Sequence, residues 1–360
     1  MRVLVVKTSS LGDILHTLPA LTDASRAIPG IRFDWTLEED FIEIPLWHAS
    51  VDRVITMAHR RWRQTPVRSF LGTEFRRYLA ELRERHYDAV IDAQGQIVKT
   101  IWIVRAARGR RFGLDWRTAR EALAALFYDR RVHVPKGQHA VERTRQLFAA
   151  ALGYPAPTGI GDYGIDREKR FDVRIDPRKL VFLHGTSWVT KEWPKAYWST
   201  LVERAGKENY RVHLTWGNAR EQARAEELAA GREHVVLLGK LSLHGMAREL
   251  ASAAGVVAVD TGLCHLAAAL AVPTLSLYGA TSTGLTGAYG LSQHYMSADF
   301  PCAPCIRKRC NYTGPRNVEP PCFEAMTPER VWRQFEQVLG QPSHQSSATP
   351  GARATRANIA

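Results

Sequence analysis

The first twenty residues constrain the fold of this chain more than any other stretch. An apolar run, Arg2–Lys7, is followed by a turn of mostly small and polar residues, Thr8–Asp13, and then by Ile14–Leu21, which has the apolar spacing of a helix. This order predicts a buried strand, a tight turn and a helix. Because such turns line the ligand crevice in open α/β sheets, we expect Asp13 to lie in a site. The alternative is that Asp13 only caps the helix.

The same alternation of strand and helix recurs along the chain. In the first half, strands are predicted at 31–37, 51–57 and 87–92, and helices at 70–85, 96–107 and 118–128. The pattern restarts later, with strands predicted at 180–183, 211–215, 235–238, 256–259 and 274–277. Strands that alternate with helices predict a mostly parallel, doubly wound α/β sheet. The restart therefore predicts two such sheets.

Length and local composition predict where the domains divide. A chain of 360 residues with 45% hydrophobic residues is long enough for two cores. Residues 154–176 are rich in Gly, Pro and charged residues, as expected of a linker. We therefore expect an N-terminal domain at 1–153 and a C-terminal domain at 177–340. The segment 341–360 is rich in Ser, Ala, Thr and Arg, which predicts a disordered tail.

The charge of the chain favours an anionic partner. Lys and Arg number 49 against 36 acidic residues, which gives a net charge of +13. Nucleic acid, an anionic membrane or a phosphorylated small molecule would all suit this balance. No apolar run approaches the ~18 residues of a membrane-spanning helix, and the chain starts directly with a strand, so we expect neither a spanning helix nor a signal peptide, and a cytoplasmic protein. Five cysteines, an odd number, argue against a disulfide framework.

Arginines are concentrated in two parts of the first half. Arg60, Arg61 and Arg63 surround a tryptophan directly after a predicted strand, and Arg120 lies in a second basic stretch at 105–131. Planar guanidinium groups bind carboxylates and phosphates in bidentate fashion, so these residues favour recognition of a discrete anionic ligand. The alternative is a solvated basic face.

Three turns in the second half follow predicted strands, where a nucleotide is expected. They hold Thr186, Ser187 and Lys191 in the first, Glu221 in the second, and Asp260, Thr261, Gly262 and His265 in the third. Hydroxyls and a cation suit a diphosphate, a glutamate suits ribose hydroxyls, and a helix N-terminus favours an anion. His265 could instead be a buried core histidine. The turns fit neither G-x-G-x-x-G nor G-x-x-x-x-G-K-[ST], so a dehydrogenase or a P-loop NTPase is disfavoured.

Taken jointly, seven segments carry a resemblance to a known family. They are 7–13 (KTSSLGD), 60–63 (RRWR), 92–95 (DAQG), 115–121 (DWRTARE), 139–145 (HAVERTR), 191–194 (KEWP) and 259–262 (VDTG). Over residues 1 to about 290 the chain resembles the lipopolysaccharide heptosyltransferase I family, within glycosyltransferase family nine.

The resemblance implies a fold and a reaction. The fold would be GT-B, two Rossmann-like domains facing across a cleft. The reaction would be an inverting transfer of L-glycero-D-manno-heptose from ADP-heptose to the Kdo region of Kdo2-lipid A, at the cytoplasmic face of the inner membrane with peripheral contact only. Heptosyltransferase II or another ADP-sugar transferase is the alternative within enzymes. A nucleic-acid-binding protein is suggested by net charge alone, and no recognition motif supports it.

The resemblance also implies a role for each candidate residue. Asp13 would be the catalytic base and Lys191 would stabilise the leaving diphosphate, without a metal. Donor binding would use Thr186, Ser187, Lys191, Glu221, Asp260, Thr261, Gly262 and His265, and acceptor binding would use Arg60, Arg61, Arg63 and Arg120.

The chain departs from the family at two places. Thr186-Ser187-Trp188 stands where the family usually has two threonines and an arginine, which keeps both hydroxyls but leaves one phosphate contact open. Four cysteines also form a C-x2-C-x4-C-x11-C array, which resembles the second heptosyltransferase of the pathway more than the first: Cys302, Cys305, Cys310 and Cys322. A structural zinc and reduced loop cysteines are both open interpretations of this array.

Overall fold

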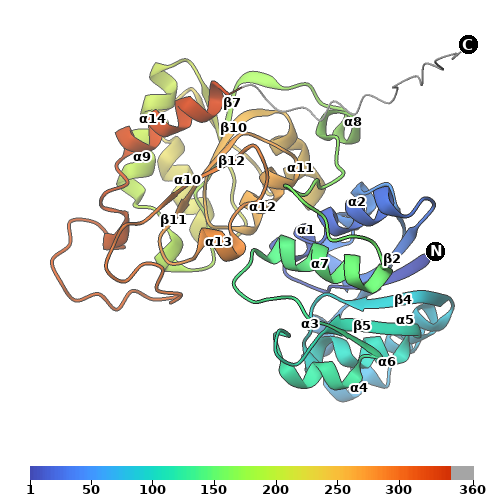
Figure 1. Ribbon diagram of the computed structural model, residues 1–360. Helices are drawn as coiled ribbons and strands as arrows, with labels where there is room; N and C mark the ends of the chain where they lie inside the picture. The colour runs from blue at the N-terminus through green and yellow to red at the C-terminus, as the bar shows by residue number, and fades with distance from the viewer. Residues whose placement is uncertain (342–360) are drawn as a thin grey trace, which may run out of the picture.

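The computed structural model describes residues 1–341, which form two lobes, each built on a six-stranded parallel sheet (Figure 1). The N-terminal lobe holds β1 (Arg2–Val6), β2 (Arg32–Glu38), β3 (Val51–Met57), β4 (His86–Asp92), β5 (Arg108–Leu114) and β6 (Arg130–Val132). The C-terminal lobe holds β7 (Asp176–Leu183), β8 (Arg211–Leu214), β9 (Val235–Leu237), β10 (Ala253–Val259), β11 (Thr274–Tyr278) and β12 (Gln293–Ser297). The predicted tail lies outside the described residues except for Gln341.

Helices cover both faces of each sheet. The N-terminal lobe contains α1 (Leu11–Leu15), α2 (Leu18–Ala27), α3 (His59–Trp62), α4 (Pro66–Phe70), α5 (Thr73–Arg83), α6 (Trp102–Ala106) and α7 (Ala140–Leu152). From the connecting segment onward come α8 (Arg167–Phe171), α9 (Lys195–Lys207), α10 (Ala219–Ala229), α11 (Leu243–Ala251), α12 (Gly262–Ala269), α13 (Thr283–Thr286) and α14 (Pro328–Leu339). Shorter turns of helix are η1 (Glu39–Phe41), η2 (Pro45–Trp47), η3 (Ile97–Ile101), η4 (Ala122–Phe127), η5 (Val189–Lys191) and η6 (Pro321–Phe323).

Both sheets have the same topology. The strand orders are β3-β2-β1-β4-β5-β6 and β12-β11-β10-β7-β8-β9, so each lobe repeats the doubly wound order of a Rossmann fold. The order reverses between β1 and β4 in the first lobe and between β7 and β10 in the second. Ligands bind outside the carboxyl ends of the strands at these reversals, and three of the four candidate turns follow β1, β7 and β10. The predicted pair of parallel α/β sheets is confirmed.

Three strands, β5, β6 and β12, were not predicted, and one predicted helix is wrong. Residues 118–128 form a turn and the 3-10 helix η4 rather than a regular helix. Strand β5 escaped prediction because glycines and arginines mask its pattern. Its glycines are required by packing: a Cβ at Gly109 would lie 2.4 Å from the carbonyl oxygen of Tyr87, and one at Gly113 would lie 2.2 Å from the ring of Tyr128.

The two lobes share one hydrophobic core. Leu15 and Leu18 of the first lobe belong to the same buried cluster as Leu266 and Leu270 of the second. Helices α1 and α12 pack against each other where the lobes meet (Figure 1). The connecting segment joins this core through Phe171 of α8, whose ring packs edge-on against Trp47 at 5.3 Å between centroids.

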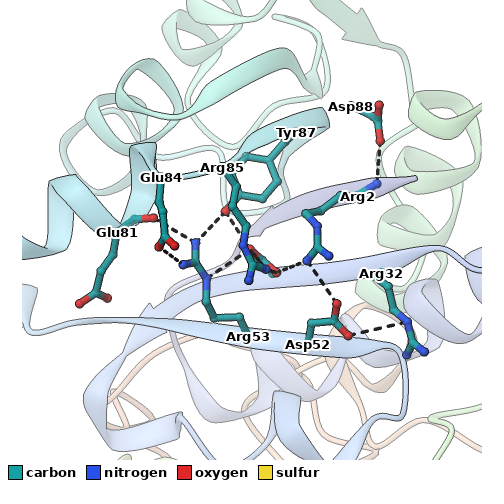
Figure 2. Close-up of polar contacts among 10 residues, drawn as sticks. Arg2, Arg32, Asp52, Arg53, Glu81, Glu84, Arg85, Tyr87 and Asp88 are labelled. Carbon is teal, nitrogen blue, oxygen red and sulfur yellow. Dashed lines mark hydrogen bonds and ion pairs between the residues drawn. The ribbon is translucent and has the colours of Figure 1, made fainter.

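A buried carboxylate ties together the amino ends of four strands in the first lobe. Asp34 of β2 is fully buried and pairs with Arg2 at 3.2 Å, Arg53 at 3.3 Å and Arg85 at 3.1 Å. It also accepts a hydrogen bond from the hydroxyl of Tyr87 at 2.9 Å. Figure 2 shows Arg2, Arg53, Arg85 and Tyr87 converging on this network. This network lies at the amino ends of the strands, whereas the crevice lies at their carboxyl ends. The network therefore stabilises the scaffold rather than the site.

Candidate active site

The turn between β1 and α1 forms the first-lobe part of the candidate site. Ser10 precedes α1, and both its backbone N–H and its hydroxyl donate to Oδ2 of Asp13 at 3.1 Å. The other carboxylate oxygen, Oδ1, lies 3.2 Å from Nζ of Lys7, and 38% of the Asp13 side chain is exposed. Asp13 is not the N-cap, which is Ser10, but it stabilises the start of the helix from the third position of a capping box, and it also presents a carboxylate to solvent in the crevice.

The surroundings of Asp13 keep its carboxyl group ionised. Burial by itself would raise the pKa of Asp13, but the Lys7 ammonium and the Ser10 N–H outweigh it and hold this pKa well below its ordinary value. A base must be unprotonated to accept a proton. Asp13 is thus in the form that a general base requires over the whole neutral range.

The turn after β10 carries the second carboxylate of the site. Oδ2 of Asp260 lies 2.7 Å from Nζ of Lys191 and accepts a hydrogen bond from Thr281 at 2.5 Å. The Thr186 hydroxyl donates to the backbone carbonyl of Asp260 at 2.9 Å. Lys191 also lies over the ring of Trp188, 4.5 Å from its centroid. These contacts bring the predicted turns after β7 and β10 together and hold the lysine beside the crevice.

Helix α12 begins directly after this turn, with Thr261 at its N-cap and Gly262 as its first residue. Free N–H groups at a helix N-terminus attract an anion. A Cβ at Gly262 would lie 2.9 Å from the Leu11 side chain, and one at Gly12 would lie 2.8 Å from the His265 ring. The two glycines therefore permit the N-terminal ends of α12 and α1 to approach closely.

A cavity of about 260 Å³ lies between the ends of β7, β8 and β10. Its wall is mostly apolar and includes Trp216, Met246 and Leu263, with Glu221 as a polar group. Oε2 of Glu221 accepts a hydrogen bond from the Gly217 N–H at 2.8 Å. An apolar slot with one hydrogen-bonding carboxylate at its edge suits a nucleoside.

These features occur together in a known family. The family described as "Glycosyltransferase family 9 (heptosyltransferase)" matches residues 75–314 of this chain. The chain belongs to this family. Its two facing, doubly wound lobes are the GT-B fold, and the resemblance drawn from the sequence is confirmed.

Individual relatives agree with this assignment. The lipopolysaccharide heptosyltransferase 1 of Pseudomonas aeruginosa is 54% identical over 352 residues, which cover 95% of this chain and 99% of the relative. The structure of E. coli heptosyltransferase WaaC with ADP has a TM-score of 0.84 and 46% identity, over 94% of this chain and 100% of that one. WaaC with ADP-2-deoxy-2-fluoro heptose gives a TM-score of 0.80 and 45% identity, over 94% and 99%.

The predicted acceptor arginines of this family 9 glycosyltransferase differ in whether they already form ion pairs with carboxylates. Arg60 pairs with Asp40 at 2.9 Å, and Arg61 pairs with both Glu39 at 3.1 Å and Glu74 at 2.7 Å. Arg63 and Arg120 are exposed, and neither forms an ion pair within the described part of the chain. Arg63 and Arg120 are therefore the two that can bind an anion without first losing a carboxylate partner.

Several residues that surround the candidate site were assigned no role from the sequence. Lys7 was noted only as part of a motif, although it is the ion-pair partner of Asp13. Lys99, on η3 after β4, donates to the Ser9 hydroxyl at 3.2 Å and adds a second cation to this turn. His16 follows Asp13 by three residues and contacts His265. His16 could have been predicted to lie near the site from its helical spacing to Asp13. Lys99 could have been predicted from its position after the end of a strand.

An ion-pair cluster around the buried Glu192 supports the loop after β7. Glu192 pairs with Arg220 and Arg224, which are one helical turn apart on α10. The same arginines donate to backbone carbonyls of the loop after β7, Arg224 to His184 at 3.3 Å and Arg220 to Thr186 at 3.5 Å. Ser187 of this loop is exposed. The cluster thus fixes the backbone that presents Thr186 and Ser187.

The cysteine array lies in the loop after β12. Cys302 is exposed, while Cys305, Cys310 and Cys322 are half-buried, and all four are free thiols. Burial, with smaller contributions from the other three thiols, raises the pKa of Cys322 to about 12. Within residues 1–341, no three His, Cys, Asp or Glu side chains are grouped so that they could hold a metal ion.

No helix in the described part of this family 9 glycosyltransferase has the length and apolar content needed to cross a bilayer.

Proposed function

We propose that this protein catalyses the inverting transfer of L-glycero-D-manno-heptose from ADP-heptose to the Kdo region of Kdo2-lipid A. The observation that carries the proposal is the ionised, half-exposed Asp13 on one lobe, with the Lys191–Asp260 pair on the other. Relatives named lipopolysaccharide heptosyltransferase 1 and the WaaC structure with ADP-2-deoxy-2-fluoro heptose support the choice of substrates.

Asp13 and Lys191 divide the chemistry between the lobes. Asp13 accepts the proton of the acceptor hydroxyl. At the same time the hydroxyl oxygen bonds to the anomeric carbon of heptose, and the bond between that carbon and the diphosphate oxygen breaks. Attack opposite the leaving group inverts the configuration. The negative charge that develops on the diphosphate is stabilised by Lys191 and by the N-terminus of α12. We propose that these groups suffice and that no metal cofactor is required.

The donor fills the turns of the second lobe. Adenosine would occupy the cavity beside Trp216, and Glu221 would accept hydrogen bonds from its ribose through Oε1, because Oε2 is used by Gly217. The diphosphate would lie at Ser187 and Lys191. The heptose would lie against the residues at the start of α12: Asp260, Thr261, Gly262 and His265. The Thr186 hydroxyl already donates to a backbone carbonyl, so we propose that it orients the turn as well as contacting phosphate.

The acceptor fills the first lobe. The carboxylates of Kdo and the phosphates of lipid A are anions that guanidinium groups bind in bidentate fashion. Arg63 and Arg120 would make direct contacts. Arg60 and Arg61 would exchange their present partners, Asp40, Glu39 and Glu74, for the acceptor, or would shape the loop that holds Arg63.

One surface of the first lobe suits peripheral contact with an anionic membrane. Val67 and Leu71, around α4, are 74% and 67% exposed, and Val98 of η3 is 72% exposed. Segments 59–72 and 96–105 contain six Lys and Arg residues and no Asp or Glu, and two of the six, Arg60 and Arg61, pair with acidic residues of other segments. Exposed apolar side chains rimmed by cations are typical of an interfacial binding surface. We propose that this surface, which we call the α4 patch, rests on the cytoplasmic face of the inner membrane.

A transfer assay tests the substrate assignment and separates it from the second heptosyltransferase. Purified protein is incubated with ADP-heptose and either Kdo2-lipid A or the same lipid carrying one heptose, and ADP release and product mass are measured. We expect transfer to Kdo2-lipid A and little to the heptosylated lipid. The reverse preference would assign the chain to the second transfer, and no transfer from ADP-heptose to either would overturn the proposal. No structural observation favours a nucleic-acid partner.

A further inference from the structure

Two histidines join the lobes at the base of the site. His16 lies at the end of α1 and His265 lies within α12, and their side chains are almost fully buried. Nε2 of His16 lies 3.1 Å from Nδ1 of His265, and the rings meet edge to face with centroids 4.6 Å apart. This hydrogen bond therefore connects α1, which carries Asp13, to α12, which follows the turn of Asp260.

Asp260 determines which ring donates. A neutral imidazole has one N–H donor and one acceptor nitrogen. Nε2 of His265 lies 3.9 Å from Oδ1 of Asp260, and a carboxylate favours a proton on the nitrogen that faces it. With its proton on Nε2, His265 offers Nδ1 as an acceptor. His16 then donates from Nε2.

Burial keeps both rings neutral, and the charges around the pair only modify its effect. Burial is the largest contribution, and it lowers the pKa of each ring. His265, His139 and Lys7 lower the pKa of His16 further, and Asp13 raises it without reversing the shift. Asp260 and Asp13 raise the pKa of His265, while His139 and Lys191 lower it. His139 faces the pair from the start of α7, with its ring centroid 5.3 Å from that of His16.

The contact lies directly against the backbone of the predicted base. A Cβ at Gly12 would lie 2.8 Å from Cδ2 of His265, so the His265 ring touches the residue before Asp13. A shift of α12 relative to α1 would move Asp13 with respect to the donor. Misplacement of a catalytic group by ~1 Å costs on the order of 10²-fold in rate.

We propose that His16 is a positioning residue which, by donating a hydrogen bond to His265, holds Asp13 in register with the turn of Asp260. This inference rests on the proposed function for the role of Asp13 as base. The hydrogen bond breaks when the lobes separate. It is also lost when both rings are protonated, because two imidazolium rings have no acceptor nitrogen between them. The joined arrangement is therefore most stable above the ordinary histidine pKa and weakens as pH falls below it.

Three variants test the positioning role. His16→Phe keeps a ring but loses the donor, and His16→Gln keeps a donor near the position of Nε2. His48→Phe is the matched control, since buried His48 bonds to Thr22 and Ser50 within the first lobe. We expect His16→Phe to lower kcat on the order of 10- to 100-fold while ADP affinity changes less than about twofold. His16→Gln should recover most of kcat and lose activity less steeply below pH 6. His48→Phe should melt earlier and keep its kcat.

Amide hydrogen exchange of the ligand-free protein tests the contact without any substrate. Loss of a contact that joins the lobes should speed exchange in both α1 and α12 of His16→Phe. In His48→Phe, α12 should exchange as in the wild type. Unchanged exchange in α12 of His16→Phe, or an equal loss of kcat in His48→Phe, would overturn the inference. A wild-type protein inactive with ADP-heptose would contradict the proposed function, while the exchange comparison would still decide whether His16 joins the lobes.

Discussion

Nζ of Lys7 lies 3.2 Å from Oδ1 of Asp13, and the same ammonium donates to the carbonyl oxygen of Ala93 at 3.0 Å. The lysine thus bridges the turns that follow β1 and β4, at the reversal of strand order in the first lobe. Its position explains why a carboxylate that is partly removed from water stays ionised. The cation that sets the charge state of Asp13 comes from the same strand-turn-helix unit as Asp13 itself.

Removing this cation should change the pH dependence of catalysis. The pKa of Asp13 is lowered in the folded protein, so its ionised form persists as pH falls through the usual carboxyl range. Lys7→Met should raise this pKa by ~1–3 units, moving the acid limb of the kcat/KM profile upward. A pH-rate series measures the shift, with Lys179→Met as control, since Lys179 pairs with Glu249 away from the site. An acid limb that does not move would mean that Asp13 is not the titrating base.

Two substitutions of Asp13 separate its chemical role from its structural role. Asp13→Asn keeps an oxygen that can accept from Ser10 but cannot accept a proton from the acceptor hydroxyl. We expect it to lower kcat by at least ~10²-fold with little change in ADP-heptose affinity or melting temperature. Asp13→Ala should also lose the hydrogen bonds to Ser10 and be less stable by ~0.5–2 kcal/mol. Near-normal turnover by Asp13→Asn would leave Asp13 as a helix cap, and Asp260 would be tested next as the base.

The buried carboxylate of Asp34 should be important for stability and not for chemistry. Removing it leaves Arg2, Arg53 and Arg85 close together without their shared anion. Breaking a buried ion pair in this way costs ~3–5 kcal/mol, so Asp34→Ala should unfold at much lower denaturant concentration. Asp40→Ala, which removes an exposed partner of Arg60, should cost less than ~1 kcal/mol. Equal effects of the two substitutions would contradict the importance assigned to burial.

Membrane contact should depend on the α4 patch. Val67→Asp with Leu71→Asp places two anions where apolar side chains are expected to meet lipid. We expect at least about tenfold weaker binding to vesicles containing phosphatidylglycerol, measured by co-sedimentation, with activity on a detergent-solubilised acceptor retained. Leu285→Asp, on α13 of the other lobe, is the control, since Leu285 is also an exposed leucine at 44%. Equal binding by all three proteins would place the membrane contact elsewhere.

The cysteines should react with thiol reagents in an order set by burial. Cys302 is exposed and should be modified first at pH 8. Burial raises the pKa of Cys264 and of Cys322 to about 12, so both should react slowly until the protein unfolds. The four loop cysteines are free in the structure, and we expect them to be reduced thiols in solution. One equivalent of zinc per chain, with Cys302 protected until chelation, would favour the zinc interpretation instead.

The sequence predicted those parts of the fold and site that depend on neighbours along the chain. Asp13, Lys191 and Asp260 could be found because each follows an apolar strand at a turn. The contact of His16 with His265 joins residues 249 positions apart, and no local pattern indicates which distant residue a buried histidine meets. The ion pairs of Arg61 with Glu39 and Glu74 could not be predicted for the same reason. Strand β5 was missed because contact with Tyr87 and Tyr128 requires glycine where strand propensity would favour larger residues.

The hydrophobic cluster that continues from Leu15 and Leu18 into Leu266 and Leu270 makes the junction of the lobes part of the folding unit. Surface that is buried at this junction must be exposed to water whenever the crevice opens, at ~25 cal/mol for each Å² of apolar area. We therefore expect the two lobes to melt in one shared transition. We also expect opening of the crevice to cost part of the free energy that stabilises the folded chain. A substitution that improves the packing at this junction should therefore both raise the melting temperature and lower kcat.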